Sequence, residues 1–240
     1  SSVYLATEAI LANGSVEQKE KWLPKLASGE VVGTFALAEG SGRPSAESLN
    51  TRFEAGKLTG KKLPVPDGNI ADFAVIVTKS DTGDGASLAL VELNQEAVIR
   101  SSVRTLDFSR GHASIEFKGA EAEILGADGS GWSAMESLMD RAAVMFAWEQ
   151  VGIADAALEQ ARDYAMGRYA FGRAIASYQA IKHKLADMYV KNTLARSNCY
   201  YGAWALNSDS SELGLAAATA RVGAIQASVN AAQENVQTHG

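Results

Sequence analysis

The chain has 240 residues, of which 47% are hydrophobic, and a formal net charge of -6. A chain of this length can bury a sizeable core in one large domain or two small ones. The acidic balance offers no basic surface for nucleic acid, and no apolar run approaches the roughly 20 residues of a membrane span. The sequence therefore predicts a folded protein that binds neither nucleic acid nor membrane.

The sequence contains a single cysteine, Cys199, which cannot form an internal disulfide and has no nearby partners for a zinc site. No base is evident that would make it a nucleophile, so a buried thiol is the favoured interpretation. Together with the lack of an opening signal sequence, this composition indicates a reducing, cytoplasmic location.

The first 30 residues have a helical pattern. Residues 4–12 are apolar enough for a helix, which Asn13-Gly14 should end. Ser15 precedes a second helix, and Ser15-x-x-Gln18 is a capping-box pattern. Ser28-Gly29 should close this segment.

From Val31 the pattern changes to short β-rich runs spaced about 8 to 12 residues apart, which is typical of an antiparallel sandwich or barrel. The predicted strands lie near 31–37, 50–55, 57–63, 72–79, 87–93, 97–104 and 112–118.

After residue 131 the pattern predicts three long helices. The first opens at Ser133-x-x-Glu136 and extends to about Gly167, and the second covers about 175–206. The third covers about 211–236, with Asp209-x-x-Glu212 as a further capping box. Alanines and glycines on these helices allow close approach, and the remaining apolar faces predict a subunit interface.

The corner between the first two helices holds the densest polar chemistry. Arg168 and Arg173 flank Phe171-Gly172, and two guanidinium groups near a helix N-terminus suit an anion such as pyrophosphate. The alternative is an ordinary helix hairpin whose arginines are merely solvated.

The residues in series make this corner specific. Arg168-x-x-Phe171-Gly172, followed by the run from Gln179 to Met188, closely resembles the C-terminal helical domain of acyl-CoA dehydrogenases, flavoenzymes that desaturate acyl-CoA thioesters. The final Gln237-Thr-His-Gly240 resembles the beginning of that family's Gln-x-x-Gly-Gly motif. Three shorter stretches support the resemblance: Phe35-Ala-Leu-Ala-Glu39, Leu106-Asp-Phe-Ser-Arg110 and Ile124-Leu-Gly126.

The resemblance implies an α+β fold of the acyl-CoA dehydrogenase type, truncated at both ends. Residues 1–30 would be the end of an N-terminal helical domain, and 31–128 a middle antiparallel β-sandwich or barrel domain. Residues 129–240 would form an incomplete C-terminal bundle of long helices. The sequence after Gly240 is expected to continue that bundle.

The resemblance also implies site residues for FAD and an acyl-CoA substrate. The cofactor would contact Arg168, Phe171 and Gln237 at one end, and Phe35, Leu37 and Ala38 of the first β-run at the other. Arg141 would hold the CoA portion. Asp140 is a candidate catalytic base, with a plain surface acid as the alternative, and Glu149 is expected to be structural. The usual glutamate base is expected beyond the end of the chain.

Four flavin-side positions depart from the family pattern. A threonine that bonds the flavin ring is replaced by Ala38, and the Gly-Ser pair near the pyrophosphate falls on Arg43-Pro44. The tryptophan covering one flavin face becomes Pro64, and the threonine beside it becomes Pro66. Alanine has no hydroxyl, and proline has no backbone donor.

These observations predict an FAD-linked acyl-CoA dehydrogenase of fatty acid or steroid degradation, or one subunit of such an enzyme, that passes electrons to an electron-transfer flavoprotein. A homo- or hetero-tetramer is expected, and the altered contacts resemble bacterial split subunits that act on bulky, steroid-type thioesters. One alternative is a flavin monooxygenase or oxidase on the same fold. The other is a non-catalytic subunit that completes another chain's FAD site.

Overall fold

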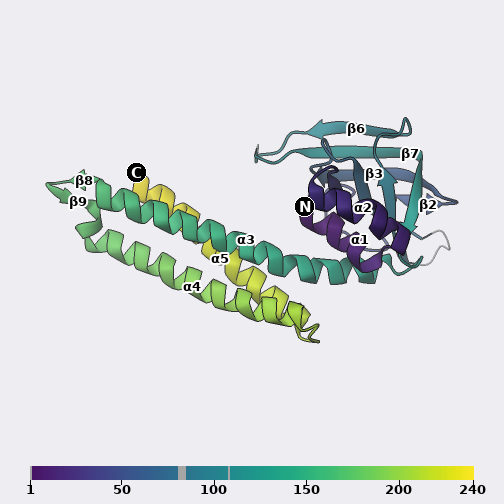
Figure 1. The fold of residues 1–240 in the computed structure, drawn as a ribbon. Helices are drawn as coiled ribbons and strands as arrows, with labels where there is room; N and C mark the ends of the chain where they lie inside the picture. Colours follow the sequence, from purple (N-terminus) through teal and green to yellow (C-terminus); the bar gives the residue numbers. More distant parts are fainter. Residues whose placement is uncertain (1, 81–84, 108) are drawn as a thin grey trace. The chain divides into compact units, whose positions relative to one another are not determined.

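The computed structural model describes residues 2–80, 85–107 and 109–240 (Figure 1). Within the predicted motif at 106–110, residue 108 lies outside this description. The chain divides into two compact units, Ser1–Leu138 and Met139–Gly240. The first unit combines short helices with a β-sheet, and the second is helical. The α+β class predicted from the sequence is confirmed, and the three-domain division stays a prediction.

The first unit opens with a π-helix, Ser2–Ala6, and two α-helices, α1 (Thr7–Asn13) and α2 (Val16–Ser28). The predicted capping box is present, because Ser15 Oγ accepts from the Gln18 amide at 3.2 Å and Gln18 Oε1 accepts from the Ser15 amide at 3.1 Å. Trp22 of α2 packs on Phe73 with ring centroids 4.3 Å apart. This contact fixes α2 against the sheet.

Seven strands form the sheet of the first unit. They are β1 (Gly33–Ala36), β2 (Arg52–Glu54), β3 (Lys57–Pro66), β4 (Phe73–Lys79), β5 (Ala86–Glu92), β6 (Val98–Val103) and β7 (His112–Leu125). Strands β4, β2, β3, β7 and β5 pair in a closed ring, while β1 and β6 are added at β4 and β7. Most pairs are antiparallel as predicted, but β1 and β2 each pair with β4 in parallel. Strands β4 and β5 are buried on both faces, because the barrel interior lies on one side of them and other parts of the first unit cover the other.

A buried ion pair joins the end of β1 to β3. Lys62 is fully buried, and its Nζ lies 2.7 Å from Glu39 Oε1 and 3.0 Å from the Leu37 carbonyl oxygen. The Glu39 carboxylate also accepts from the amides of Asn50 at 2.6 Å and Thr51 at 3.0 Å. The pair thus fixes the segment after β1 to two other parts of the chain.

Burial and hydrogen bonding act in opposite directions on this pair. Burial raises the pKa of the Glu39 carboxyl, but hydrogen bonds from Lys62 and Thr51 and the Lys62 charge outweigh it and lower that pKa to about 2. Burial lowers the pKa of the Lys62 amine, and the Glu39 carboxylate opposes that shift. The arrangement keeps Glu39 ionised far into the acid range.

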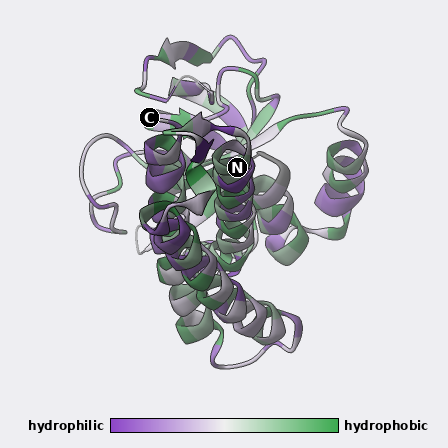
Figure 2. Ribbon diagram, turned by 90° about the vertical axis from the view of Figure 1, so that its left-hand side faces the viewer, coloured by the Kyte–Doolittle hydropathy of each residue, from purple (hydrophilic) through white to green (hydrophobic). Residues whose placement is uncertain are grey.

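The second unit contains most of α3 (Gly131–Gly167), α4 (Gln179–Asn207) and α5 (Leu213–His239), with a small hairpin of β8 (Tyr169–Ala170) and β9 (Arg173–Ala174) and a 3-10 turn, Ile175–Ser177. Its core is mostly alanine, and Cys199 and Met188 are buried within it. The small side chains let the helix axes approach closely, as predicted. Coloured by hydropathy, the helices show hydrophobic and hydrophilic stretches alternating along their length (Figure 2).

Three local predictions for these helices were wrong. α3 begins at Gly131, and Ser133 lies inside it with its hydroxyl donating to the Ser130 carbonyl at 2.9 Å. Asp209 does not cap α5, because its φ is +46° and Ser210 Oγ instead accepts from the Glu212 amide at 3.2 Å. The third helix, expected to end near residue 236, continues as far as His239.

Among the described residues, none of the helices combines the length and the apolar character that a membrane crossing requires. The same residues contain no group of three or more histidine, cysteine or acidic side chains arranged to hold a metal ion.

Replacing Lys62 by methionine should destabilise the first unit by about 3 kcal/mol, because removal of one partner leaves a buried carboxylate without its counter-charge. Lys61→Met, at an exposed neighbour on the same strand, is the matched control and should have little effect. Urea unfolding followed by tryptophan fluorescence measures both. Equal losses in the two variants would show that the pair contributes nothing specific.

The lowered pKa of Glu39 also predicts a pH dependence. A depressed folded-state pKa contributes stability above the ordinary value of 4.5, and this contribution is lost as the pH falls from there through about 2. Glu39→Gln should therefore remove part of the acid sensitivity between about pH 5 and pH 2. Parallel acid profiles of the variant and the unaltered protein would contradict this assignment.

Candidate functional site

The segment after β1 lies directly beside β3. The Leu63 amide donates to the Ala38 carbonyl oxygen, and the Gly40 amide donates to the Leu63 carbonyl oxygen, both at 2.8 Å. These bonds bring together two of the departures found in the sequence, Ala38 and Pro64. Phe35 itself is buried in β1, and Leu37 and Ala38 are half-buried.

The chain then forms a loop around a pocket of about 230 Å³. Gly40 and Gly42 have φ angles of +130° and +119°, which side chains other than glycine rarely adopt. The lining comes from this loop and from the segment before β2: Leu37, Glu39, Gly40, Ser41, Gly42, Arg43, Pro44, Ser48, Leu49 and Asn50. The Lys62–Glu39 pair lies at the base of this loop. Glu39 belongs to the motif Phe35-Ala-Leu-Ala-Glu39, but the sequence alone does not reveal its partner. That partner is Lys62 of β3.

A flavin ring needs hydrogen-bond donors along one edge, and this part of the chain supplies few. Ala38 has no hydroxyl, and its carbonyl oxygen is already bonded to Leu63. Pro64 and Pro66 have no N–H, and the Pro66 carbonyl accepts from Thr34 Oγ1 at 2.6 Å. The residues at these positions do not fit the ring of FAD.

The helical corner in the second unit is a tight β-hairpin. Phe171 and Gly172 have φ angles of +52° and +81°, the combination of a type I′ turn between β8 and β9. Phe171 is therefore held at the tip of the turn, where it is 97% exposed. Helix α4 begins only at Gln179. The prediction that a helix N-terminus lies at the corner was therefore wrong.

The two arginines of the corner are exposed but held differently. The Arg173 guanidinium lies over the Tyr178 ring at 4.0 Å, and the Tyr178 hydroxyl donates to the Ala170 carbonyl at 3.0 Å. The Arg168 backbone is fixed at the end of α3 and accepts from the Ile175 amide at 2.8 Å. An exposed aromatic side chain with an exposed arginine on either side of it in the sequence suits an aromatic, phosphate-bearing ligand, and the residues of this corner fit the other end of FAD in that respect.

The end of α5 lies near this corner within the second unit. His239 stacks on Tyr164 with ring centroids 4.1 Å apart, and the Tyr164 hydroxyl donates to the His239 carbonyl at 3.3 Å. Tyr164 is one turn before Arg168, and Gln237 is two residues before His239 and exposed. The structure therefore places Arg168 and Gln237 at the same end of the helical unit.

Arg141 lies at the other end of the second unit. It is half-buried, 3.9 Å from the exposed Asp209, and lines a pocket of about 580 Å³ with Trp148 and Met145. The neighbouring Asp140 is exposed, and its carboxylate would lie 3.4 Å from a Cβ atom at Gly214 in the first turn of α5. Glu149 is exposed on α3.

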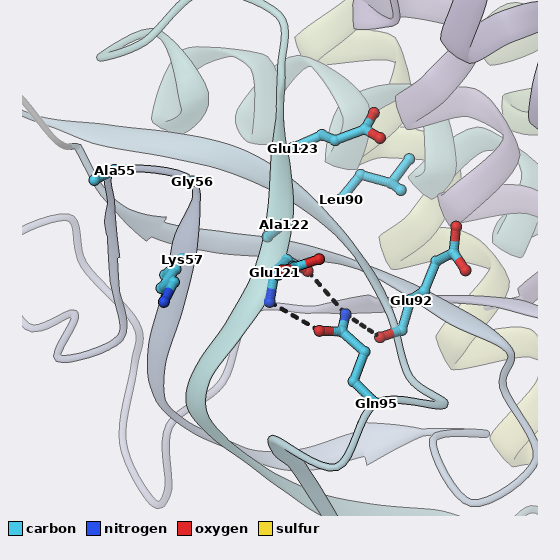
Figure 3. A pocket seen from close by; sticks show the side chains of 9 residues that line it. All are labelled: Ala55, Gly56, Lys57, Leu90, Glu92, Gln95, Glu121, Ala122 and Glu123. Atoms are coloured by element: carbon cyan, nitrogen blue, oxygen red, sulfur yellow. Dashed lines mark hydrogen bonds between the residues drawn. The ribbon is translucent and has the colours of Figure 1, made fainter.

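A polar pocket of about 540 Å³ in the first unit had no counterpart in the sequence interpretation (Figure 3). Its centre is Gln95, whose side chain donates to the carbonyls of Glu92 and Glu121 and accepts from the Glu121 amide, all within 2.9 Å. The Glu92 carboxylate pairs with Lys21 at 2.8 Å. These contacts brace the turn before β6 against β7, so they serve the fold.

Comparison with known proteins gives a consistent result. A family model described as the acyl-CoA dehydrogenase C-terminal domain matches residues 129–240, and the corresponding N-terminal domain model matches residues 1–30. An acyl-CoA dehydrogenase of Bacillus subtilis (strain 168) is 36% identical, over 98% of this chain and 65% of its own length.

Two solved structures are also similar. Butyryl-CoA dehydrogenase from Megasphaera elsdenii matches all of this chain and 66% of its own, with a TM-score of 0.92 and 25% identity. A chain in the structure of the electron transferring flavoprotein of Acidaminococcus fermentans matches 98% of this chain and 65% of its own, with a TM-score of 0.91 and 28% identity.

The chain spans 65% of the length of the Bacillus subtilis relative that it matches. Both family models describe the same enzymes, and together they cover the helical segments on either side of the β-sheet. The chain belongs to the acyl-CoA dehydrogenase family.

Proposed function

We propose that this chain is a subunit of an FAD-dependent acyl-CoA dehydrogenase, which desaturates the α,β bond of an acyl-CoA thioester and passes electrons to an electron-transfer flavoprotein. The main support is the exposed corner of Arg168, Phe171 and Gly172, held by a type I′ turn in a chain of this family. A cytoplasmic location, a tetrameric assembly and a bulky or fatty acyl substrate are parts of the same proposal.

When bound, FAD supplies the hydride acceptor of this reaction. On this chain, the residues that would hold it are Arg168, Phe171 and Gln237 at the corner end. A guanidinium–pyrophosphate contact is charge-assisted and can be bidentate, which makes it among the stronger hydrogen-bonded contacts of proteins. Arg173, held over Tyr178, adds positive charge to the same end.

We infer that this chain completes a flavin site whose ring pocket belongs to a different polypeptide. The flavin-side positions Ala38, Pro44, Pro64 and Pro66 lack the groups that the family uses there, whereas the corner retains Arg168 and Phe171. The same asymmetry supports a hetero-oligomer over a simple homotetramer.

The full-length chain purified alone should carry little or no FAD, and together with its partner it should carry about one FAD per heterodimer. Flavin absorbance measures both. Arg168→Ala should abolish FAD retention in the complex, while Arg162→Ala, at an exposed arginine near the end of α3 that pairs with Asp163, should not. Stoichiometric FAD in a homo-oligomer of this chain would show that Ala38 and the prolines are tolerated.

Arg141 is proposed to hold the CoA portion of the substrate, because it is a half-buried cation beside an open pocket with an aromatic wall. Arg141→Ala should weaken substrate binding by about 1.5 to 3 kcal/mol, the range for a charge-assisted hydrogen bond. Steady-state kinetics of the complex should show KM raised by about 10- to 150-fold. An unchanged KM in an active complex would remove Arg141 from the site.

Asp140 is the candidate base on this chain, but its surroundings favour a structural role. A carboxylate beside the first turn of α5 is stabilised by the helix dipole. We therefore expect Asp140→Asn to leave kcat within about threefold, whereas loss of a general base costs about 100-fold or more. A kcat loss of that size, with FAD content unchanged, would identify Asp140 as the base.

A further inference from the structure

The hairpin of β8 and β9, between the end of α3 and the start of α4, is very small (Figure 1). It has two residue pairs, Tyr169 with Ala174 and Ala170 with Arg173. An isolated two-stranded hairpin is marginally stable at best in water. Contacts from outside the two strands must therefore fix the hairpin and the side chains that it carries.

Tyr178 supplies such contacts to both strands. Its hydroxyl donates to the carbonyl oxygen of Ala170 in β8 at 3.0 Å, and the Arg173 guanidinium of β9 lies over its ring, 4.0 Å from the centroid. Ala170 and Arg173 are direct cross-strand partners, so their side chains lie on the same face of the hairpin. One half-buried side chain thus ties the two strands together at the pair beside the turn.

The position of Tyr178 is set by α4 and not by the hairpin. Its carbonyl oxygen accepts from the amides of Ile181 at 3.2 Å and Lys182 at 3.1 Å, in the first turn of α4. Its own amide donates to the Ile175 carbonyl oxygen at 3.1 Å, which closes the 3-10 turn. All of these contacts join residues 170–182, so they do not depend on which surfaces of the bundle are covered.

Stacking on a ring leaves a guanidinium able to bind an anion. The ring contacts the face of the group, whereas the five N–H donors lie in its plane. An arginine that binds a ligand must also give up rotamer freedom, and the contact with Tyr178 removes part of that freedom before any ligand arrives. Arg173 is thereby preorganised for a charge-assisted contact with a phosphate.

We propose that Tyr178 is a positioning residue for FAD, which holds Arg173 so that its guanidinium binds the pyrophosphate of the cofactor. This role rests on the proposed function, in which the corner with Arg168 and Phe171 holds that end of FAD. Arg173 touches the cofactor, and Tyr178 acts through Arg173. The alternative is that Tyr178 only stabilises the hairpin, so that its loss weakens every contact of the corner.

A double-mutant cycle of FAD affinity tests this role in the complex of the full-length chain with its partner, stripped of flavin and titrated with FAD. Arg173→Ala should raise the Kd of FAD about 10- to 150-fold, as for a lost charge-assisted hydrogen bond. Tyr178→Leu should raise it about 3- to 30-fold, as for a lost cation–π contact. The double variant should bind FAD as Arg173→Ala does, apart from the loss that Tyr178→Phe measures. Two losses that multiply would overturn the proposal.

Two further variants serve as controls. Tyr178→Phe keeps the ring and should restore most of the affinity that Tyr178→Leu loses. Tyr189→Leu, further along α4, should leave the Kd unchanged. Flavin fluorescence measures each Kd. If Tyr178→Phe binds FAD as weakly as Tyr178→Leu, the ring does not position Arg173 and the proposal is wrong.

Salt dependence separates positioning from a purely structural role. Ions screen an arginine–phosphate contact, so the slope of log Kd against log salt should fall equally in Tyr178→Leu and Arg173→Ala. Weak binding by Tyr178→Leu with an unaltered slope would show that Tyr178 only stabilises the hairpin.

Arg168→Ala distinguishes a failure of this role from a failure of the proposed function. If Arg168→Ala weakens FAD binding and Tyr178→Leu does not, only the positioning role is wrong. If Arg168→Ala, Arg173→Ala and Tyr178→Leu all bind FAD as the unaltered complex does, the corner does not hold FAD, and both proposals are wrong.

Discussion

The buried contact between Lys62 and Glu39 holds three segments of the first unit together. An amine with no solvent exposure is stable there only because a carboxylate and a backbone carbonyl satisfy it. Glu39 in turn holds the amides of Asn50 and Thr51, so one side chain connects the end of β1, β3 and the approach to β2. The glycine loop that carries Arg43 and Pro44 begins at this junction.

That constraint explains how the departures from the family pattern are tolerated. In the proposed function Ala38 and Pro64 lack the side chains that would contact the flavin, but the backbone here is fixed by Leu63, Gly40 and the ion pair. The scaffold can therefore persist after its binding groups have gone. A chain that had lost both the binding groups and the Lys62–Glu39 pair would be expected to lose the loop geometry as well.

Much of the fold could be predicted because its signals are local. Ser15 and Gln18 form the capping box that their spacing indicates, and every predicted strand exists, although β7 continues to Leu125, well past the end expected near residue 118. The failures depend on distant contacts. A Cβ at Gly131 would lie 2.4 Å from Ser87 Cα, so glycine allows α3 to begin against β5 before the expected cap. The parallel pairing of β1 with β4 likewise joins segments about 40 residues apart.

The candidate site was predictable only in part, for the same reason. The corner motif lies within six residues, so the sequence could locate it. Its two positive φ angles were less predictable, because glycine adopts such an angle readily and phenylalanine does not. The role of Lys62 could not be read, since its partner Glu39 is 23 residues away and only burial makes the pair significant. The pocket around Gln95 depends on backbone atoms of two strands, which carry no sequence signal.

The alanine core of the second unit determines what its outer surface must contain. Because α3, α4 and α5 approach closely through small side chains, the larger aliphatic residues have little room inside. Polar links such as Asn192 to Asp155, at 3.3 Å, join the helices at the margins of the core. The bundle is thus closely packed inside and carries larger aliphatic side chains among the charged ones on its surface.

Cys199 is enclosed in that alanine core, and burial raises the pKa of its thiol. Both effects keep the thiolate form rare and out of reach of reagents while the helices are packed. Modification then has to wait for the helices to separate, so the rate at which a thiol reagent labels this residue reports how often they do so. Cys199 can therefore serve as an internal probe for the opening of the helical unit.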